Sequence, residues 1–178
     1  ANARFQFTPE WSLTASTRLA SDRTFLRRYD ISRDDRLRSN FDLERINEGS
    51  YLSIAGWWTQ TLRTGDKQGL VPVALPMIDY RRRMSDPLLG GKVELEVNSL
   101  AISRTSGQDT QRAVAGARWD LTRMTRWGQQ VTLTALARGD AYHSSDNLTT
   151  TTAAYRGLPG WQTRATATAA IDVKWPLV

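Results

Sequence analysis

Polar and apolar residues alternate along most of this chain, in runs longer than the usual strand of about five or six residues. The clearest two runs span residues 92–120, on either side of a short polar loop. In the first run Val93, Leu95 and Val97 alternate with charged residues, and in the second run alanines lie between Arg112 and Arg118. Successive side chains on a strand point to opposite faces. Residues 92–120 therefore predict a long hairpin with one charged face and one small or apolar face.

Six other segments carry a strand pattern: residues 11–20, 36–46, 51–63, 70–83, 129–142 and 161–175. Residues 51–63 are apolar on both faces, around Gly56. Residues 70–83 contain Pro72 and Pro76, which lack an amide hydrogen and so predict a break or bulge in the hydrogen-bond ladder. We find no convincing helical pattern. The sequence predicts an all-β fold of about eight long antiparallel strands.

The connections between these strands alternate in kind. Residues 47–50, 85–91 and 122–128 are short turns at one end of the strands. Residues 21–35 and 143–160, at the other end, are long and polar, and residues 64–69 and 105–109 at that end are shorter. Short turns on one side and longer loops on the other are typical of outer-membrane barrels. Trp127 and Trp175 would lie at the short-turn end, where such barrels carry an aromatic girdle.

A soluble antiparallel sandwich or barrel remains an alternative, because its strands also alternate. Two features favour a transmembrane β-barrel segment. The strands are long, and the faces rich in alanine would fill a packed core poorly but are tolerable against lipid. The charged face would suit a water-filled lumen.

Composition narrows the choice further. The chain has 178 residues, which we treat as a single domain over residues 1–178, with 40% hydrophobic residues and a mean hydropathy of −0.48. No run approaches the roughly 18 consecutive apolar residues of a membrane helix, which excludes a helical membrane protein. There is no cysteine, so disulfides and thiolate metal sites are excluded. The net charge is +6, but acids are interleaved with the arginine runs, and we expect no nucleic-acid partner.

The only histidine, His143, lies beside Ser144, Ser145 and Asp146. A Ser/His/Asp triad is not expected, since triad members are normally brought together from distant parts of a fold. A metal site formed by Asp140, His143 and Asp146 is not expected either, because no further ligand cluster accompanies them. We predict no catalytic residue, no metal site and no cofactor.

Several long segments resemble a known family. They are DRTFLRRYDISRDDRLRSNFDLERI, YLSIAGWWTQTLR, VPVALPMIDYRRR, GGKVELEVNSLAISRTSGQDTQRAVAGARWDL and WGQQVTLTALARGDAYH. Together they are similar to the LPS-assembly outer-membrane protein family (LptD or OstA, the organic solvent tolerance protein), in its alphaproteobacterial form. The resemblance runs from about residue 11 to residue 178.

The resemblance implies a very large barrel in the cell outer membrane of Gram-negative bacteria. It implies lipopolysaccharide as cargo, a plug lipoprotein in the lumen, and periplasmic bridge proteins that deliver lipopolysaccharide to a periplasmic domain. The family inserts lipopolysaccharide through an opening between the first and last strands, without a catalytic step. We expect this chain to be an interior part of the wall, without the periplasmic domain and without that opening. Pro72 and Pro76 are therefore interpreted as ladder breaks.

The alternation divides the strand residues into two groups. The group expected to face the lumen is charged and occupies alternate positions: Arg36, Arg38, Asp42, Glu44, Glu94, Glu96, Arg112, Arg118, Arg138, Asp140, Arg164, Asp172 and Lys174. The group expected to face lipid comprises Leu13, Phe41, Val93, Leu95, Val97, Ala115, Trp119, Leu133, Ile171 and Trp175. Alternative functions are a small eight-stranded outer-membrane barrel that acts as an enzyme or lipid-binding module, and a soluble β domain.

Overall fold

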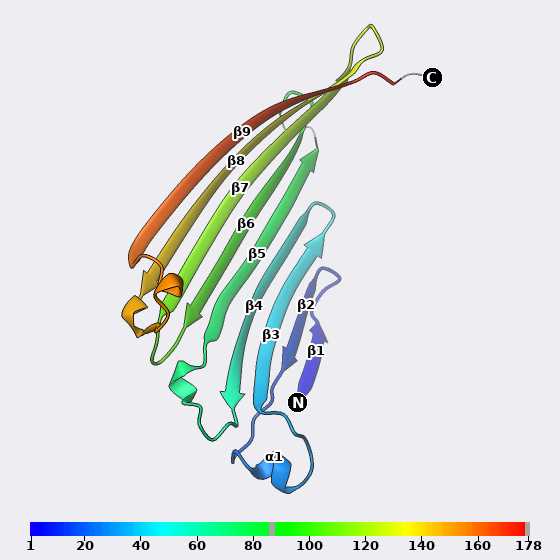
Figure 1. Cartoon of the computed structure of the whole chain (residues 1–178). Coiled ribbons are helices and arrows are strands. Elements are labelled where there is room, and N and C mark those ends of the chain that lie inside the picture. The colour runs from blue at the N-terminus through cyan, green and yellow to red at the C-terminus, as the bar shows by residue number, and fades with distance from the viewer. Residues whose placement is uncertain (86–87, 177–178) are drawn as a thin grey trace.

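The computed structural model describes residues 1–85 and 88–176, which form one antiparallel sheet with its strands in sequence order (Figure 1). Each strand pairs with the next one, and β3 to β9 have 12 to 16 residues each. The strands are β1 (Asn2–Gln6), β2 (Trp11–Ser16), β3 (Arg36–Asn47), β4 (Ser50–Thr61), β5 (Val73–Ser85), β6 (Lys92–Ser103), β7 (Asp109–Met124), β8 (Gln130–Ser145) and β9 (Gly160–Lys174). The predicted all-β antiparallel fold is confirmed.

The strand count and several boundaries differ from the prediction; β5 begins at Val73 rather than at residue 70, and β8 extends to Ser145, into the predicted loop 143–160. β1 was missed because five residues are too few to display a period, and it forms by pairing with β2. The first predicted strand ends at Ser16 rather than at Ala20. β7 continues to Met124, so residues 122–124, predicted as part of a turn, extend the ladder with β8, where the hydroxyls of Thr122 and Thr132 lie 3.1 Å apart.

The connections alternate between two ends of the sheet, as predicted. At the short-turn end lie residues 7–10, 48–49 and 125–129; the predicted turn 85–91 falls partly outside the described residues. At the long-loop end lie residues 17–35, 62–72, 104–108 and 146–159. These loops hold the short helices α1 (Phe25–Arg28), η1 (Gln68–Leu70), η2 (Asn147–Thr149) and η3 (Ala153–Tyr155), which are too short for a recognisable period. Figure 1 shows α1 and the loop before β9 at the same end of the sheet.

A bulge interrupts the pairing of β4 with β5. The register shifts between Ala74 and Met77, the segment that holds Pro76, which has no amide hydrogen to donate. This confirms the predicted break at Pro76, whereas Pro72 precedes the strand. Beyond the bulge, the end of β4 no longer pairs with β5, and the Gln68 side chain takes the place of β5 there. The Thr61 N–H donates to Gln68 Oε1 over 3.0 Å, and Gln68 Nε2 donates to the Thr59 carbonyl over 2.8 Å.

The sheet buries very little apolar surface. Among the described residues, the buried hydrophobic side chains are Leu37, Leu62, Ala74 and Val114. The accessible surface is 12845 Å², against roughly 8,700 Å² for a compact protein of this mass. No helix among the described residues has the length and hydrophobicity needed to cross a membrane.

The curved sheet remains open. β1 and β9 are its two edges and each pairs on one side only within the described chain. Figure 1 shows these edge strands apart, on opposite sides of the curved sheet. The sheet of the described chain is not closed into a barrel, so the predicted barrel segment stays a prediction.

Candidate functional site

The strand register places all thirteen predicted lumen-facing residues on one face of the sheet, here called the charged face. Residues paired directly across two strands share a face, so the face of a residue can be followed from each strand to the next, from β3 to β9. Glu94 pairs with Arg118, and Glu96 pairs through Gly116 with Arg138. Even-numbered residues of β3 reach the same face through odd-numbered residues of β4 and β5.

Ion pairs neutralise much of the charge on this face. The Asp140 side chain is 1% exposed and accepts hydrogen bonds from two arginines. Arg138 donates from Nε and Nη2 to Oδ1, each over 3.2 Å, and Arg164 donates from Nε and Nη2 to Oδ2 over 3.2 and 2.9 Å. Arg164 comes from β9, so the carboxylate ties the edge strand to β8. Charge-assisted contacts of this kind are stronger than neutral hydrogen bonds.

Neighbouring side chains fix other charged groups on the same face. The Arg38 guanidinium lies 4.9 Å from the centre of the Trp57 ring, and that of Arg112 lies 5.4 Å from the centre of Tyr142. The Tyr51 hydroxyl donates to Glu44 Oε1 over 3.1 Å. On the charged face, cations and anions thus lie side by side, and neighbouring side chains hold several of them in place.

The opposite face, here called the apolar face, is almost free of charge along the middle of the strands. Rows of aliphatic side chains run across its strands. One row consists of Leu13, Leu43, Ile54 and Ile78 on β2 to β5, and another begins at Leu95 on β6 and continues through two alanines to Ala167 on β9. Nothing in the described chain covers this face, and Ile171 is 73% exposed. The predicted lipid-facing residues on it are Leu13, Phe41, Val93, Leu95, Val97, Ala115, Trp119, Leu133 and Ile171; Trp175 follows the end of β9.

Amphipathic rings mark both ends of the apolar face. At the short-turn end, the Trp119 indole N–H donates to the Leu88 carbonyl over 3.2 Å, and the Arg45 guanidinium lies 5.8 Å from the Trp11 ring centre. At the long-loop end, the rings of His143 and Trp161 lie 4.9 Å apart. Such rings, apolar on one side and polar on the other, collect where a membrane meets water.

The structure does not assemble the two catalytic or metal arrangements considered for His143. Asp140 lies on the charged face and is held by two arginines, whereas His143 lies on the apolar face against Trp161. The Ser144 hydroxyl donates to Asn147 Oδ1 over 3.1 Å. Within residues 1–85 and 88–176 no group of three potential metal ligands converges.

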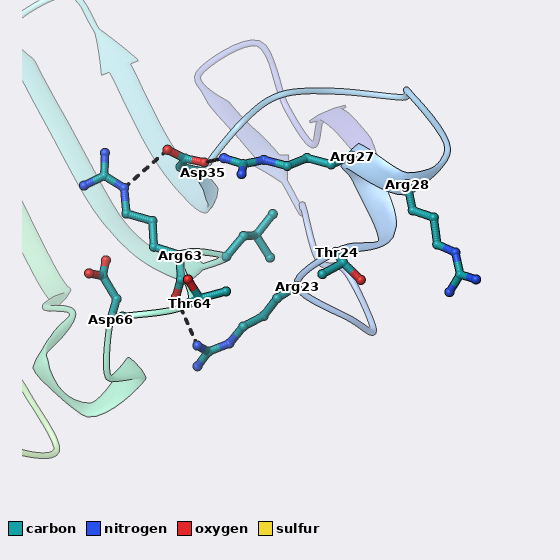
Figure 2. Close-up of a pocket in the computed structure, with 10 residues that line it drawn as sticks. Arg23, Thr24, Arg27, Arg28, Asp35, Arg63, Thr64 and Asp66 are labelled. Atoms are coloured by element: carbon teal, nitrogen blue, oxygen red, sulfur yellow. Dashed lines mark hydrogen bonds and ion pairs between the residues drawn. The ribbon is translucent and has the colours of Figure 1, made fainter.

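Sequence reasoning missed a cavity at the long-loop end, here called the arginine basin. It has a volume of about 770 Å³ and lies between the 17–35 and 62–72 loops. Figure 2 shows the residues that line it, which include Arg23, Arg27, Arg28, Asp35 and Arg63. The arginines of residues 21–35 were interpreted as a solvated loop, because Arg63 joins them only in space. The alternation of the connections does place both loops at the same end of the sheet, and this is the signal by which the cavity could have been expected from the sequence.

Side chains of the strands hold the two loops in place. The Gln60 side-chain amide accepts from the Ala20 N–H and donates to the Ala20 carbonyl, each over 2.9 Å. In the 62–72 loop, the Asp66 carboxylate accepts from the Thr61 hydroxyl over 2.9 Å and from Arg36 over 3.4 Å. The Thr61 hydrogen bond is the main reason why the pKa of Asp66 lies below its ordinary value; Arg36 lowers the pKa further, against a smaller opposing effect of desolvation.

The sequence model of the family described as LptD, LPS transport system D, matches residues 1–178. No curated protein matches the chain. The family match includes both faces of the sheet and all of its loops.

Proposed function

We propose that this chain, which belongs to the LptD family, forms part of the wall of the outer-membrane barrel that assembles lipopolysaccharide into the outer leaflet. Proteins of this family act in lipopolysaccharide transport at the outer membrane, and they are transport and assembly proteins rather than enzymes. The proposal for this chain is narrower: an interior wall segment, of the alphaproteobacterial type, within a barrel domain that includes residues 1–178.

The observation that carries the proposal is the uncovered apolar face. A soluble sheet of this size would bury one face in a core, but the described chain buries only four hydrophobic side chains. Hydrocarbon is the partner that suits long rows of leucine, valine and alanine with aromatic rings at both ends. Strands of 12 to 16 residues are long enough, since a tilted membrane strand needs about 9 to 11 residues.

The charged face would then line the water-filled lumen. Its thirteen predicted residues would keep the lumen hydrated and offer hydrogen bonds to the sugars and phosphates of lipopolysaccharide or to the plug lipoprotein. Alternating charges suit a conduit, because a surface of one sign would hold an anionic lipid too tightly for release. The bridge proteins would deliver their cargo outside this segment.

The two open edges support an interior position in the wall. Unpaired backbone groups on β1 and β9 cannot be left in hydrocarbon, where each would cost several kcal/mol, on the order of a lost hydrogen bond in an apolar solvent. Further strands of the same barrel would therefore continue the ladder at both edges. The opening through which lipopolysaccharide leaves would lie between other strands.

Photo-crosslinking in cells tests this function. A benzoylphenylalanine at Thr132 lies on the charged face and one at Leu133 lies on the apolar face of the same strand. We expect the Thr132 probe to capture the plug lipoprotein, and the Leu133 probe, which faces the bilayer, not to capture it. Equal capture by the two probes, or capture by Leu133 alone, would overturn the wall assignment.

A further inference from the structure

We infer that the arginine basin binds a phosphate monoester. The inference rests on the proposed function for its position at the membrane surface, and on the basin itself for its chemistry. The ligand class is a phosphomonoester group, carried either by a lipid headgroup or by free phosphate.

Opposite charges fix one side of the basin. Asp35 receives hydrogen bonds from Arg27 on one carboxylate oxygen and from Arg63 Nε on the other, the latter over 3.3 Å. Figure 2 shows Asp35 between these two guanidinium groups. Asp35 thereby holds Arg27 and Arg63, which are far apart in the sequence, on the same side of the basin.

The other two arginines of the basin, Arg23 and Arg28, are not neutralised by an ion pair with a described carboxylate. Arg23 Nη1 donates to the Arg63 carbonyl over 3.0 Å, a contact that positions the side chain without neutralising it. Among the lining residues, four arginines against the carboxylates of Asp35 and Asp66 leave two positive charges in excess. Two charges next to the lining offset each other: Asp22 interacts with Arg28, and Arg36 contacts Asp66. A phosphate monoester carries about −1.5 to −2 at neutral pH, so its charge matches this excess.

Guanidinium groups also match phosphate in shape. The planar fork of arginine donates two parallel N–H bonds to two phosphate oxygens, and such contacts are stronger than neutral hydrogen bonds. Arg23 is held through one terminal nitrogen, so other donors of its fork can reach a ligand. The basin therefore favours phosphate over a carboxylate, which would neutralise only one of the two excess charges.

The backbone that carries these side chains is already fixed. The Leu62 N–H donates to the Asp35 carbonyl over 2.8 Å, which joins the ends of the two loops. The Gln60 contacts with Ala20 anchor the start of the 17–35 loop. A ligand would therefore pay little conformational entropy to order the site.

The location makes a lipid headgroup a feasible source of the phosphate. The basin lies at the long-loop end, beyond the edge of the apolar face. In a bacterial outer-membrane barrel the longer loops face the cell exterior. Phosphate groups of the outer leaflet would then lie at the height of the basin.

The test uses the complete barrel that contains this chain, folded in phosphatidylcholine nanodiscs. Binding of inorganic phosphate is measured by calorimetry for the wild type, for Arg23→Gln/Arg28→Gln, and for Arg4→Gln/Arg126→Gln, which removes the same charge outside the basin. A second set of nanodiscs contains phosphatidylcholine and phosphatidic acid in about a nine-to-one ratio, as a source of phosphomonoester headgroups.

We expect the Arg23→Gln/Arg28→Gln variant to bind inorganic phosphate about tenfold more weakly, the loss expected for one charge-assisted contact. The Arg4→Gln/Arg126→Gln variant should bind like the wild type. Weaker binding of inorganic phosphate in the phosphatidic acid nanodiscs identifies a lipid headgroup that reaches the basin; unchanged binding identifies free phosphate as the ligand.

Equal losses in the two double variants, or wild-type binding by Arg23→Gln/Arg28→Gln, would overturn the inference, since general basic charge would then explain any affinity. Protease protection of the strands in the nanodiscs is measured in parallel. Strands of this chain that stay open to protease in the complete, inserted barrel contradict the proposed function, whereas protected strands without basin-dependent binding contradict this inference alone.

Discussion

Adjacent residues of one strand face different surroundings in this sheet. On β9, Ala167 belongs to the apolar face and Thr168 to the charged face, where it pairs with Leu136. The period of two was enough to predict such assignments from the sequence, because a strand side chain has only two directions available. The polar exceptions were not predictable: Ser39 and Gln60 lie on the apolar face because their side chains bind the backbone of the 17–35 loop.

An arginine introduced on β9 should distinguish the two faces. In the complete barrel that contains this chain, folded in phospholipid vesicles, Ala167→Arg should lower the free energy of unfolding by about 2–4 kcal/mol, since the guanidinium would enter the middle of the bilayer. Thr168→Arg, one residue away, should change the free energy of unfolding much less because its side chain meets water. Urea unfolding in vesicles measures both, and a larger loss for Thr168→Arg would invert the face assignment.

The buried carboxylate on the charged face provides a second prediction at this scale. Asp140→Asn should lower the denaturant midpoint, because Arg138 and Arg164 would lose the anion that holds them together across β8 and β9. Asp172→Asn is the matched control, since Asp172 is 57% exposed and contacts only Lys174 among the described residues, over 3.6 Å. Equal shifts in the two variants would show that Asp140 makes no special contribution.

At the scale of the elements, the sequence predicted the long strands and their alternating connections. It missed β1, which has five residues and depends on β2 for its hydrogen bonds. It also gave no sign that Gln68 completes the edge of β4 beyond the bulge at Pro76, because that substitution of a side chain for a strand depends on the folded path of the 62–72 loop.

The 62–72 loop should respond to acid through Asp66. The pKa of Asp66 is lowered, chiefly by the Thr61 hydroxyl, so its stabilising effect is complete above the unfolded value of about 3.9 and is lost as the pH falls through the folded pKa. Thr61→Val should raise the pKa of Asp66 toward its ordinary value, and the loop should lose hydrogen-exchange protection at a higher pH than in the wild type. Carboxyl carbon NMR in micelles measures the pKa.

The exposed Thr64 in the same loop offers a control for this change. Thr64→Val leaves the Asp66 hydrogen bonds intact and should leave its titration unchanged. A Thr61→Val titration that overlays the wild type would show that the hydroxyl does not set the pKa.

At the scale of the whole molecule, the sequence predicted the two faces of the sheet, and the membrane wall stays a prediction. The open edges of β1 and β9 and the scarcity of buried apolar side chains in the described chain follow from how far one sheet extends in space, which alternation along a chain does not specify. The arginine basin was missed for a related reason: Arg63 reaches Asp35 only because two loops separated by β3 and β4 leave the same end of the sheet.

The central claim is that one face of the sheet contacts lipid and the other contacts water. The chain has no cysteine, so a spin label on a single introduced cysteine reports on one site without background. Labels at residues 165–170 of β9 are placed in the complete barrel folded in phospholipid vesicles, with any cysteine outside this chain replaced by serine. They are tested for collision with oxygen, which partitions into lipid, and with a water-soluble nickel chelate.

We predict alternation with a period of two. Labels at Ala165, Ala167 and Ala169 should collide mainly with oxygen, and labels at Thr166, Thr168 and Ala170 mainly with the nickel chelate. Ala170 is informative because alanine itself has no preference for water, so its accessibility reports the face alone. Uniform access of the nickel chelate at all six positions, or the opposite alternation, would contradict the account.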